Sequence, residues 1–199
     1  YLREMPRNIE ISTKQQAREY VRRASLKITP ERFAAANRQI YISCYSILRQ
    51  KNINSLFIYV SRENEADTHM LIKHFLKDKI KIYVPKVIGD NEMVAARLMT
   101  WDGLITGRYG LREPKNFEEV AVEIDMVVAP GLAFTIGGAR LGQGLGYYDR
   151  WLTQNPYADT IALAYEHQIL SAVPTSRHDV NVAEIITEKR RIVCTSANL

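Results

Sequence analysis

The spacing of hydrophobic and polar positions changes repeatedly along the chain, and each change predicts a new element. Thr13 and Thr29 each precede a run of helix-forming residues, and a hydroxyl at such a position can cap a helix. The second run opens with Pro30 and keeps a rough apolar face to about Gln50. Residues 55–60 form a short, continuous apolar and aromatic run instead, which is typical of a buried strand.

Helical and strand-like segments alternate over the rest of the chain. Apolar residues have helical spacing over 67–77, and another helix is predicted to begin near Tyr147. Further strands are predicted at 81–84 (stopped by Pro85), 93–99, 125–129, 160–165 and 192–194, with a loop over 103–114. The alternation predicts an α/β fold with a mainly parallel sheet and an N-terminal helical hairpin. No linker-like tract divides the chain, so we expect one domain over 1–199, with 1–12 open to disorder.

The composition narrows the class of protein without identifying it. The chain has 199 residues, of which 46% are hydrophobic and 25% charged, and this balance excludes collagen-like, low-complexity and strongly disordered chains. Its two cysteines, Cys44 and Cys194, lie far apart without metal-ligand spacing, which favours a reduced, cytoplasmic protein. No stretch approaches the roughly 18 apolar residues of a membrane span, so we expect no membrane partner.

The positive charge is concentrated at the start of the chain. Residues 1–50 hold ten Lys and Arg against four Asp and Glu, a net of +6, whereas the other 149 residues have a net of −1. A nucleic-acid partner is not expected, because the chain has no stripe of aromatic residues interleaved with Lys and Arg and no recognised nucleic-acid-binding module. Lys14 and Arg18 are four residues apart and project from one helix face. On spacing alone, that face is either solvated surface or a contact for an anion.

A glycine-rich turn is the most informative stretch. Residues 130–150 hold six of the ten glycines and lie between a predicted strand and a predicted helix, where ligands of open α/β sheets bind. Glycines there let backbone N–H groups approach an anion, and Arg140 can bind a phosphate with two N–H groups. Asp149, in the first turn of the helix, is placed to meet a magnesium ion beside such phosphates. The turn matches neither the Rossmann fingerprint nor a Walker loop, so a simple tight connection remains an alternative.

Five ordered segments of the chain carry a family resemblance. The sequence GARLGQGLGYYD at 138–149, which follows PGLAF at 130–134, resembles the signature of the 5-formyltetrahydrofolate cyclo-ligase family. KQQAR at 14–18, EADT at 65–68, YGLREP at 109–114 and the VP and HD pairs at 173–179 are similar to other motifs of that family. The matches span most of the chain in the family's order.

The resemblance implies a fold and a reaction. The fold is expected to be an open Rossmann-like α/β sheet sandwiched by helices. The reaction is the ATP- and magnesium-dependent conversion of 5-formyltetrahydrofolate to 5,10-methenyltetrahydrofolate, with release of ADP and phosphate. In it the formyl oxygen is phosphorylated, the neighbouring folate nitrogen attacks the activated carbon, and phosphate leaves. The expected partners are therefore these two small molecules, bound by a monomer or weak dimer.

The resemblance also implies roles for individual residues. ATP would contact Lys14, Arg18, Arg140, Leu141, Gly142, Gln143, Gly144, Leu145, Gly146, Tyr147 and Tyr148. The folate would contact Val60, Glu65, Gln143, Gly144, Leu145, Gly146 and Tyr147. Asp149 and Asp179 would hold magnesium, and Arg140, Tyr147 and Asp149 form the expected catalytic set.

Two positions depart from the family pattern. Thr135 stands where the family usually has Asp, and Gln143 stands where Arg or Lys is common. The first removes an acidic group and the second removes a cation beside the ligands. A non-catalytic homologue that binds folate or nucleotide is therefore the alternative to an active enzyme.

Overall fold

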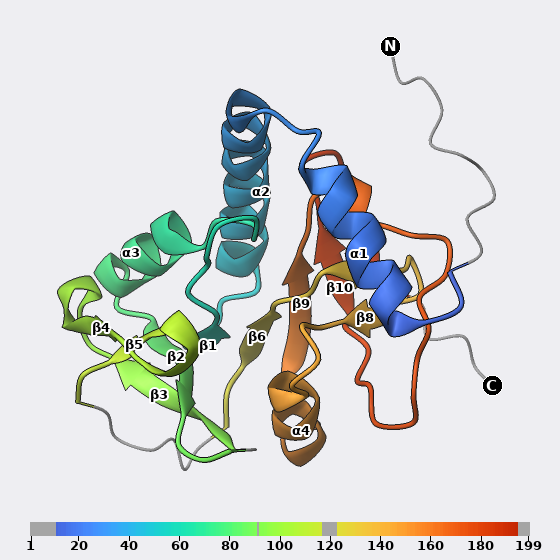
Figure 1. Cartoon of the computed structure of the whole chain (residues 1–199). Coiled ribbons are helices and arrows are strands. Elements are labelled where there is room, and N and C mark those ends of the chain that lie inside the picture. The colour runs from blue at the N-terminus through green and yellow to red at the C-terminus, as the bar shows by residue number, and fades with distance from the viewer. Residues whose placement is uncertain (1–10, 91, 117–122, 195–199) are drawn as a thin grey trace.

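A seven-stranded sheet forms the centre of the fold (Figure 1). The structure is a computed structural model that describes residues 11–90, 92–116 and 123–194. The helices are α1 (Lys14–Ser25), α2 (Pro30–Gln50), α3 (His69–Lys77) and α4 (Tyr147–Gln154). The strands of the sheet are β1 (Ser55–Ile58), β2 (Lys81–Val87), β3 (Met93–Leu98), β6 (Met126–Ala129), β9 (Asp159–Leu163), β10 (Glu184–Ile186) and β11 (Arg191–Val193). The expectation of disorder falls mostly on residues 1–10, which lie outside the described residues.

The order of the strands confirms the predicted α/β fold. The sheet runs β11-β10-β9-β6-β1-β2-β3. Its five inner strands are mutually parallel, and β3 and β11 pair antiparallel at the two edges. Parallel strands send their carboxyl ends to one edge of the sheet, so the loops after β1 and β6 leave side by side.

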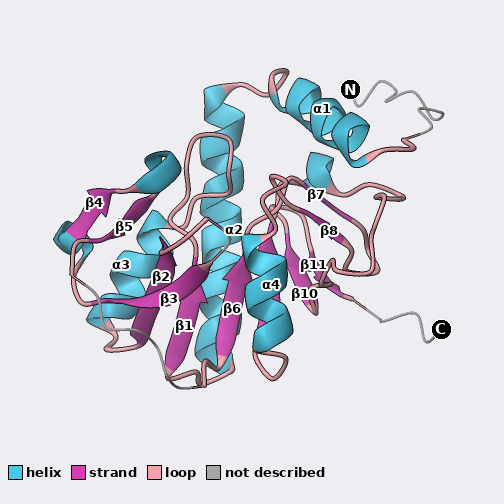
Figure 2. Ribbon diagram, turned by 60° about the horizontal axis from the view of Figure 1, so that its bottom comes forward, coloured by secondary structure: helices cyan, strands magenta, loops and turns pink. Residues whose placement is uncertain are grey.

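The residues of each inner strand alternate between two cores. Leu56 and Ile58 of β1 face α2 and α3, whereas Phe57 faces Trp151 and Leu152 of α4. Both faces are therefore covered by helices, and Figure 2 shows α2 and α4 on opposite sides of the sheet. Burial on both faces explains the continuous apolar runs in the sequence. No helix in the described part of the chain is long and apolar enough to cross a lipid bilayer.

The two N-terminal helices begin where their caps predict but pack on different parts of the domain. Thr13 and Gln16 form a capping box for α1, and the Thr29 side chain caps α2. α2 lies along the sheet, whereas α1 stands away from it (Figure 1). α1 packs on the hairpin of β7 (Ala133–Phe134) and β8 (Arg140–Leu141), with Ala17 and Val21 in a small cluster of their own.

Three local predictions were wrong. Pro85 does not stop β2, because the pairing with β1 ends at Tyr83 and the strand continues beside β3 alone, where a missing N–H is tolerated. The predicted loop over 103–114 contains a hairpin of β4 (Leu104–Thr106) and β5 (Arg112–Pro114). β10 was not predicted at all. These strands have three residues each, which is too short for their spacing to be detected.

Candidate active site

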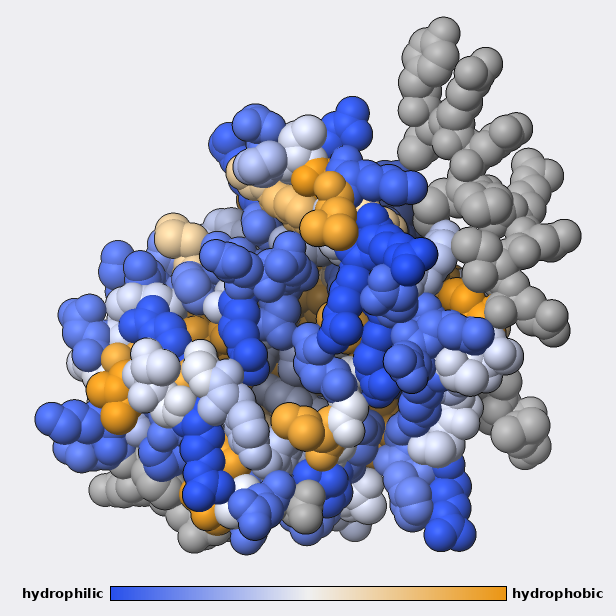
Figure 3. Space-filling model, viewed as in Figure 1, coloured by the Kyte–Doolittle hydropathy of each residue, from blue (hydrophilic) through white to orange (hydrophobic). Residues whose placement is uncertain are grey.

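A cavity of about 270 Å³ opens beyond the carboxyl ends of β1 and β6. α1, the glycine-rich turn and the loops after β1 and β6 line it, and Figure 3 shows this face of the molecule hollowed between them. Every residue that the motifs assigned to a site lies in its lining: Lys14, Arg18, Val60, Glu65, Arg140, Leu141, Gly142, Gln143, Gly144, Leu145, Gly146, Tyr147, Tyr148, Asp149 and Asp179. The fold thus brings together residues from both ends of the chain.

The glycine-rich turn lies directly against α1. Arg18 donates a hydrogen bond from Nε to the carbonyl of Gly142 (2.9 Å). Gly144 has a φ of +113°, and a Cβ there would lie 3.4 Å from Nη2 of Arg18. Gly146 adopts a φ of +68° as the residue before α4 and offers no side chain to cap it. Both glycines are therefore required by the backbone, and the turn holds its N–H groups beside a guanidinium.

Two ion pairs link the cavity's cations to its predicted metal ligands. Nη2 of Arg140 lies 2.5 Å from Asp149, and Nζ of Lys14 lies 2.5 Å from Asp179. The Arg140 side chain is only 2% exposed, whereas that of Lys14 is 30% exposed. Burial alone would raise the pKa of Asp179, but the hydrogen bonds from Lys14 and Ser176 and the Lys14 charge outweigh it and lower that pKa. Lys14 can turn towards a ligand more easily than Arg140 can, because it is partly solvated.

The two carboxylates differ in what they can offer a metal ion. Oδ1 of Asp149 accepts hydrogen bonds from Arg140 and from the Val180 N–H (3.1 Å), and no described residue donates to its Oδ2. Both oxygens of Asp179 are already engaged, by Lys14 and the Ser176 N–H. Among the described residues, no group of three or more His, Cys, Asp and Glu could hold a metal. A magnesium ion that brings its own phosphate and water ligands fits Asp149 better than Asp179.

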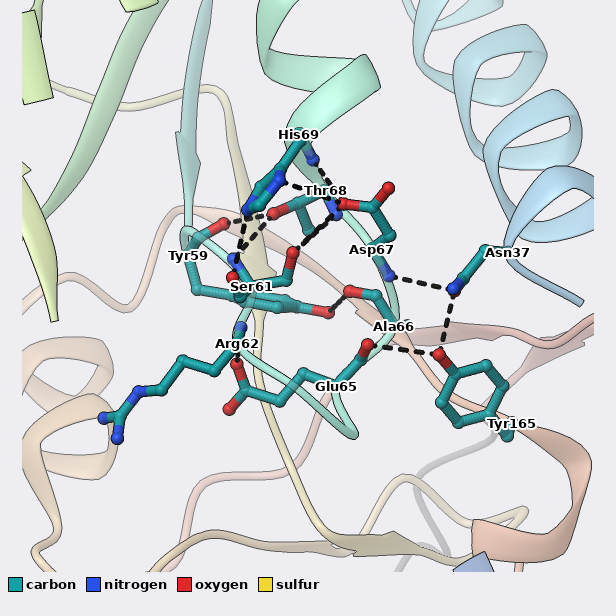
Figure 4. A network of polar contacts seen from close by, with 10 residues as sticks. All are labelled: Asn37, Tyr59, Ser61, Arg62, Glu65, Ala66, Asp67, Thr68, His69 and Tyr165. Carbon is teal, nitrogen blue, oxygen red and sulfur yellow. Dashed lines mark hydrogen bonds and ion pairs between the residues drawn. The ribbon is translucent and has the colours of Figure 1, made fainter. Parts of the chain in front are cut away.

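A polar network fixes the loop that carries Glu65 (Figure 4). The Tyr165 hydroxyl lies 3.1 Å from the Glu65 carbonyl and 2.9 Å from Oδ1 of Asn37. Tyr59 donates its hydroxyl proton to the Ala66 carbonyl (2.9 Å). The Glu65 carboxylate itself accepts only the N–H of Arg62 (2.9 Å) within the described structure. It therefore keeps acceptor capacity for a ligand.

Several lining residues were not predicted. Arg62 follows β1, and Arg112 belongs to β5, where its guanidinium lies over the ring of Trp101 (4.8 Å to the ring centre). Tyr109 lines the cavity in the left-handed region (φ 57°). With Lys14, Arg18 and Arg140, the two new arginines give five cations against three carboxylates in the lining, which favours an anionic ligand. Arg112 and Tyr109 belong to the YGLREP motif at 109–114, and Arg62 precedes the EADT motif at 65–68, so these motifs were the signal that could have found them.

The structure separates the two departures from the family pattern. Thr135 is not among the described residues that line the cavity; its Oγ1 accepts the Ala139 N–H (3.2 Å) in the β7–β8 turn. Gln143 does line the cavity and is exposed. Tyr147, expected to be catalytic, donates its hydroxyl proton to the Asp90 carbonyl (3.0 Å) at the cavity's edge. The absence of a cation at position 143 can therefore affect ligand binding directly. Thr135, by contrast, stabilises the β7–β8 turn and does not line the cavity.

Comparisons with known proteins agree with the motifs. The model of the 5-formyltetrahydrofolate cyclo-ligase family matches residues 10–188. The chain is 29% identical to the 5-formyltetrahydrofolate cyclo-ligase of Mus musculus over 154 residues, which cover 69% of this chain and 75% of that protein. It is 27% identical to the enzyme of the same name from Haemophilus influenzae, over 87% of this chain and 96% of that one.

A solved structure extends the agreement to the fold. The NMR structure of Aquifex aeolicus 5,10-methenyltetrahydrofolate synthetase superposes with a TM-score of 0.82 at 28% identity, over 94% of this chain and 95% of that one. The expected fold class, and the expectation of a ligase of folate one-carbon metabolism, are confirmed. From the match to the family model and this likeness of fold it follows that the chain belongs to the 5-formyltetrahydrofolate cyclo-ligase family.

Proposed function

We propose that this chain converts 5-formyltetrahydrofolate and ATP to 5,10-methenyltetrahydrofolate, ADP and phosphate. The formyl oxygen attacks the γ-phosphorus and the bond to ADP breaks. The neighbouring folate nitrogen then attacks the formyl carbon, loses its proton, and phosphate leaves with the formyl oxygen. A cytoplasmic location and a monomeric or weakly dimeric state remain predictions alongside this reaction.

One observation supports this reaction more than any other. A single cavity is lined at one end by phosphate-binding chemistry, from Lys14, Arg18 and the 142–146 turn, and elsewhere by Val60 and Glu65 after β1. Transfer of a phosphoryl group to a folate oxygen requires both ligands in one enclosed space, because catalysis of phosphoryl transfer consists mainly of positioning and charge stabilisation. A protein that binds only one of these ligands would not need both the phosphate-binding end and the part of the cavity lined by Val60 and Glu65.

The cations of the cavity have distinct tasks in this proposal. Arg18 forms no ion pair within the described structure and lies against the turn, so it is placed to contact phosphate. Lys14 exchanges Asp179 for a phosphate oxygen when ATP binds. Arg140 is buried and keeps Asp149 in place, and therefore acts by orienting a carboxylate. Glu65 accepts hydrogen bonds from N–H groups of the reduced pterin.

Magnesium, when bound with ATP, would neutralise charge on the phosphate oxygens, and Asp149 would be its protein ligand through Oδ2. Asp179 becomes available only after Lys14 has turned away from it, so we assign it a secondary role. The carboxylate oxygens, water and phosphate of such a site match the ligands that magnesium prefers.

The test is a turnover assay with purified protein. Mixing it with 5-formyltetrahydrofolate and Mg-ATP should produce the ultraviolet absorbance of the methenyl product, and omission of ATP should abolish the signal. Calorimetry with each ligand is run beside it. Binding of both ligands without product would establish the non-catalytic alternative that Gln143 makes conceivable, and absence of both binding and product would reject the proposal outright.

A further inference from the structure

Tyr148 lines the cavity and carries a buried hydroxyl that has no partner among the described residues. The hydroxyl oxygen of Tyr148 is shielded from solvent, and no group among the described residues forms a hydrogen bond with it. Buried polar groups are nearly always paired, and one that is not lowers the stability of the unliganded fold. A ligand that supplies the missing partner would remove this cost in the loaded enzyme.

The ring that carries this hydroxyl is held firmly. It stacks on Phe57 of β1 with ring centres 5.5 Å apart and an angle of 13° between the planes. The Arg140 guanidinium lies 6.0 Å from the centre of the same ring. The hydroxyl cannot easily turn elsewhere to find a partner, because its ring is fixed by a buried strand and a buried cation.

Groups from the proposed folate end of the cavity lie beside Tyr148. Its ring packs against both core clusters, one of which contains Tyr59 and Val60, the residues that follow β1. Burial raises the pKa of the Tyr148 phenol and the Glu65 carboxylate raises it further, with Arg140 opposing. The phenol therefore stays protonated and can donate to an acceptor. The hydroxyl of Tyr59, by contrast, is already used on Ala66.

We propose that the Tyr148 hydroxyl is a specificity-determining donor to an acceptor atom of the reduced folate, and not a contact for ATP as its motif position implies. This inference rests on the proposed function for the identity of the ligand. A site with a fixed buried donor favours ligands that carry the matching acceptor, because any other ligand leaves the donor unpaired. The unpaired hydroxyl then lowers the stability of the ligand-free enzyme, and its hydrogen bond to the folate stabilises the complex.

The decisive variant is Tyr148→Phe, which keeps the ring and removes only the hydroxyl. We expect the dissociation constant of 5-formyltetrahydrofolate, measured by calorimetry, to rise about tenfold, the effect of one lost hydrogen bond to a ligand. The value for Mg-ATP should stay within about twofold of wild type. A rise for Mg-ATP with no rise for the folate would overturn the inference and return Tyr148 to the nucleotide.

A second measurement needs no ligand and so does not depend on the proposed function. The midpoint of thermal unfolding of ligand-free Tyr148→Phe should equal or exceed that of wild type, because an unpaired buried hydroxyl has been removed. The matched control is Tyr59→Phe, which removes a buried hydroxyl that has a partner and should lower the midpoint. If Tyr148→Phe lowers the midpoint as much as the control does, the hydroxyl has a structural partner and the inference fails. If wild type binds the folate but makes no product, the proposed function fails. The calorimetric and the thermal measurements on Tyr148→Phe would still test the role of the hydroxyl.

Discussion

The buried pair of Arg140 and Asp149 allows a quantitative test of how burial changes the contribution of an ion pair to the free energy of unfolding. The change is Asp149→Asn, which keeps the size of the side chain and removes its charge. The Arg140 guanidinium, 2% exposed, would then be a buried cation without a counter-charge. Breaking a buried pair by removing one partner costs about 3–5 kcal/mol, and the amide can still accept hydrogen bonds, so we take about 3 kcal/mol.

The same change at Asp179 is the matched control. Its partner Lys14 is 30% exposed and can be solvated when the carboxylate is lost. A fully exposed pair contributes about 0.2–1 kcal/mol, and since this pair is only partly exposed we expect Asp179→Asn to cost about 1 kcal/mol, the upper end of that range. Both variants keep an acceptor for the neighbouring backbone N–H groups. The comparison therefore isolates the burial of the cation.

The assay is thermal and urea unfolding of both variants at neutral pH. For a chain of this size 1 kcal/mol corresponds to about 2–4 °C, so Asp149→Asn should lower the midpoint by about 6–12 °C and Asp179→Asn by at most about 4 °C. The double variant Arg140→Gln with Asp149→Asn should recover much of the loss, since no uncompensated charge remains. Equal shifts for the two single variants, or no recovery in the double variant, would refute the reasoning. Turnover over a magnesium series then separates the metal role of Asp149 from its structural one.

Three further predictions concern the walls of the cavity and the helix beside it. Tyr165→Phe removes the hydroxyl beside the Glu65 carbonyl, and the KM for the folate should rise several-fold while the KM for ATP stays constant; a parallel rise in both would point to general misfolding instead. Gly144→Ala combines a φ of +113° with a methyl group 3.4 Å from Arg18, so the KM for ATP should rise at least about tenfold, and unchanged ATP kinetics would contradict the close approach. Burial lowers the pKa of His167 to about 4 from its ordinary 6.5, so the unfolded chain takes up a proton first as the pH falls. The free energy of unfolding should therefore decline between pH 6.5 and 4, and His167→Gln should flatten that decline in urea titrations; an unaltered slope would show that other groups cause it.

The sequence predicted the parts of this molecule that depend on local rules. The caps at Thr13 and Thr29 begin their helices where expected, since capping involves only neighbouring residues. The buried inner strands with long apolar runs are also found, because a strand covered on both faces needs apolar side chains at every position. The glycine-rich turn was located from its glycines, and the structure gives Gly144 and Gly146 the positive φ that such a turn requires.

Pairings across the chain were beyond prediction. The motifs gave Asp149 and Asp179 the same role, but one is held by a buried arginine and the other by a partly exposed lysine. Whether a carboxylate is free depends on which cation the fold places beside it, and no local pattern carries that information. Tyr148 is similar, because an unpaired hydroxyl can only be recognised once all its neighbours are known.

The separate packing of α1 has a consequence for the order in which the protein can form. Ala17 and Val21 of α1 bury themselves against Ala133, Leu141 and Val173, all of which are made long after them. During synthesis α1 is made before any of these partners. The carboxylate that pairs with its Lys14, that of Asp179, is made 165 positions later. The cavity is therefore among the last features to close, and contacts of such long range are slow to form. A ribosome-bound chain that ends shortly before Val173 would lack β10 and β11, the Val173 contact of α1 and the Asp179 partner of Lys14, although the rest of the cavity lining would already have been made.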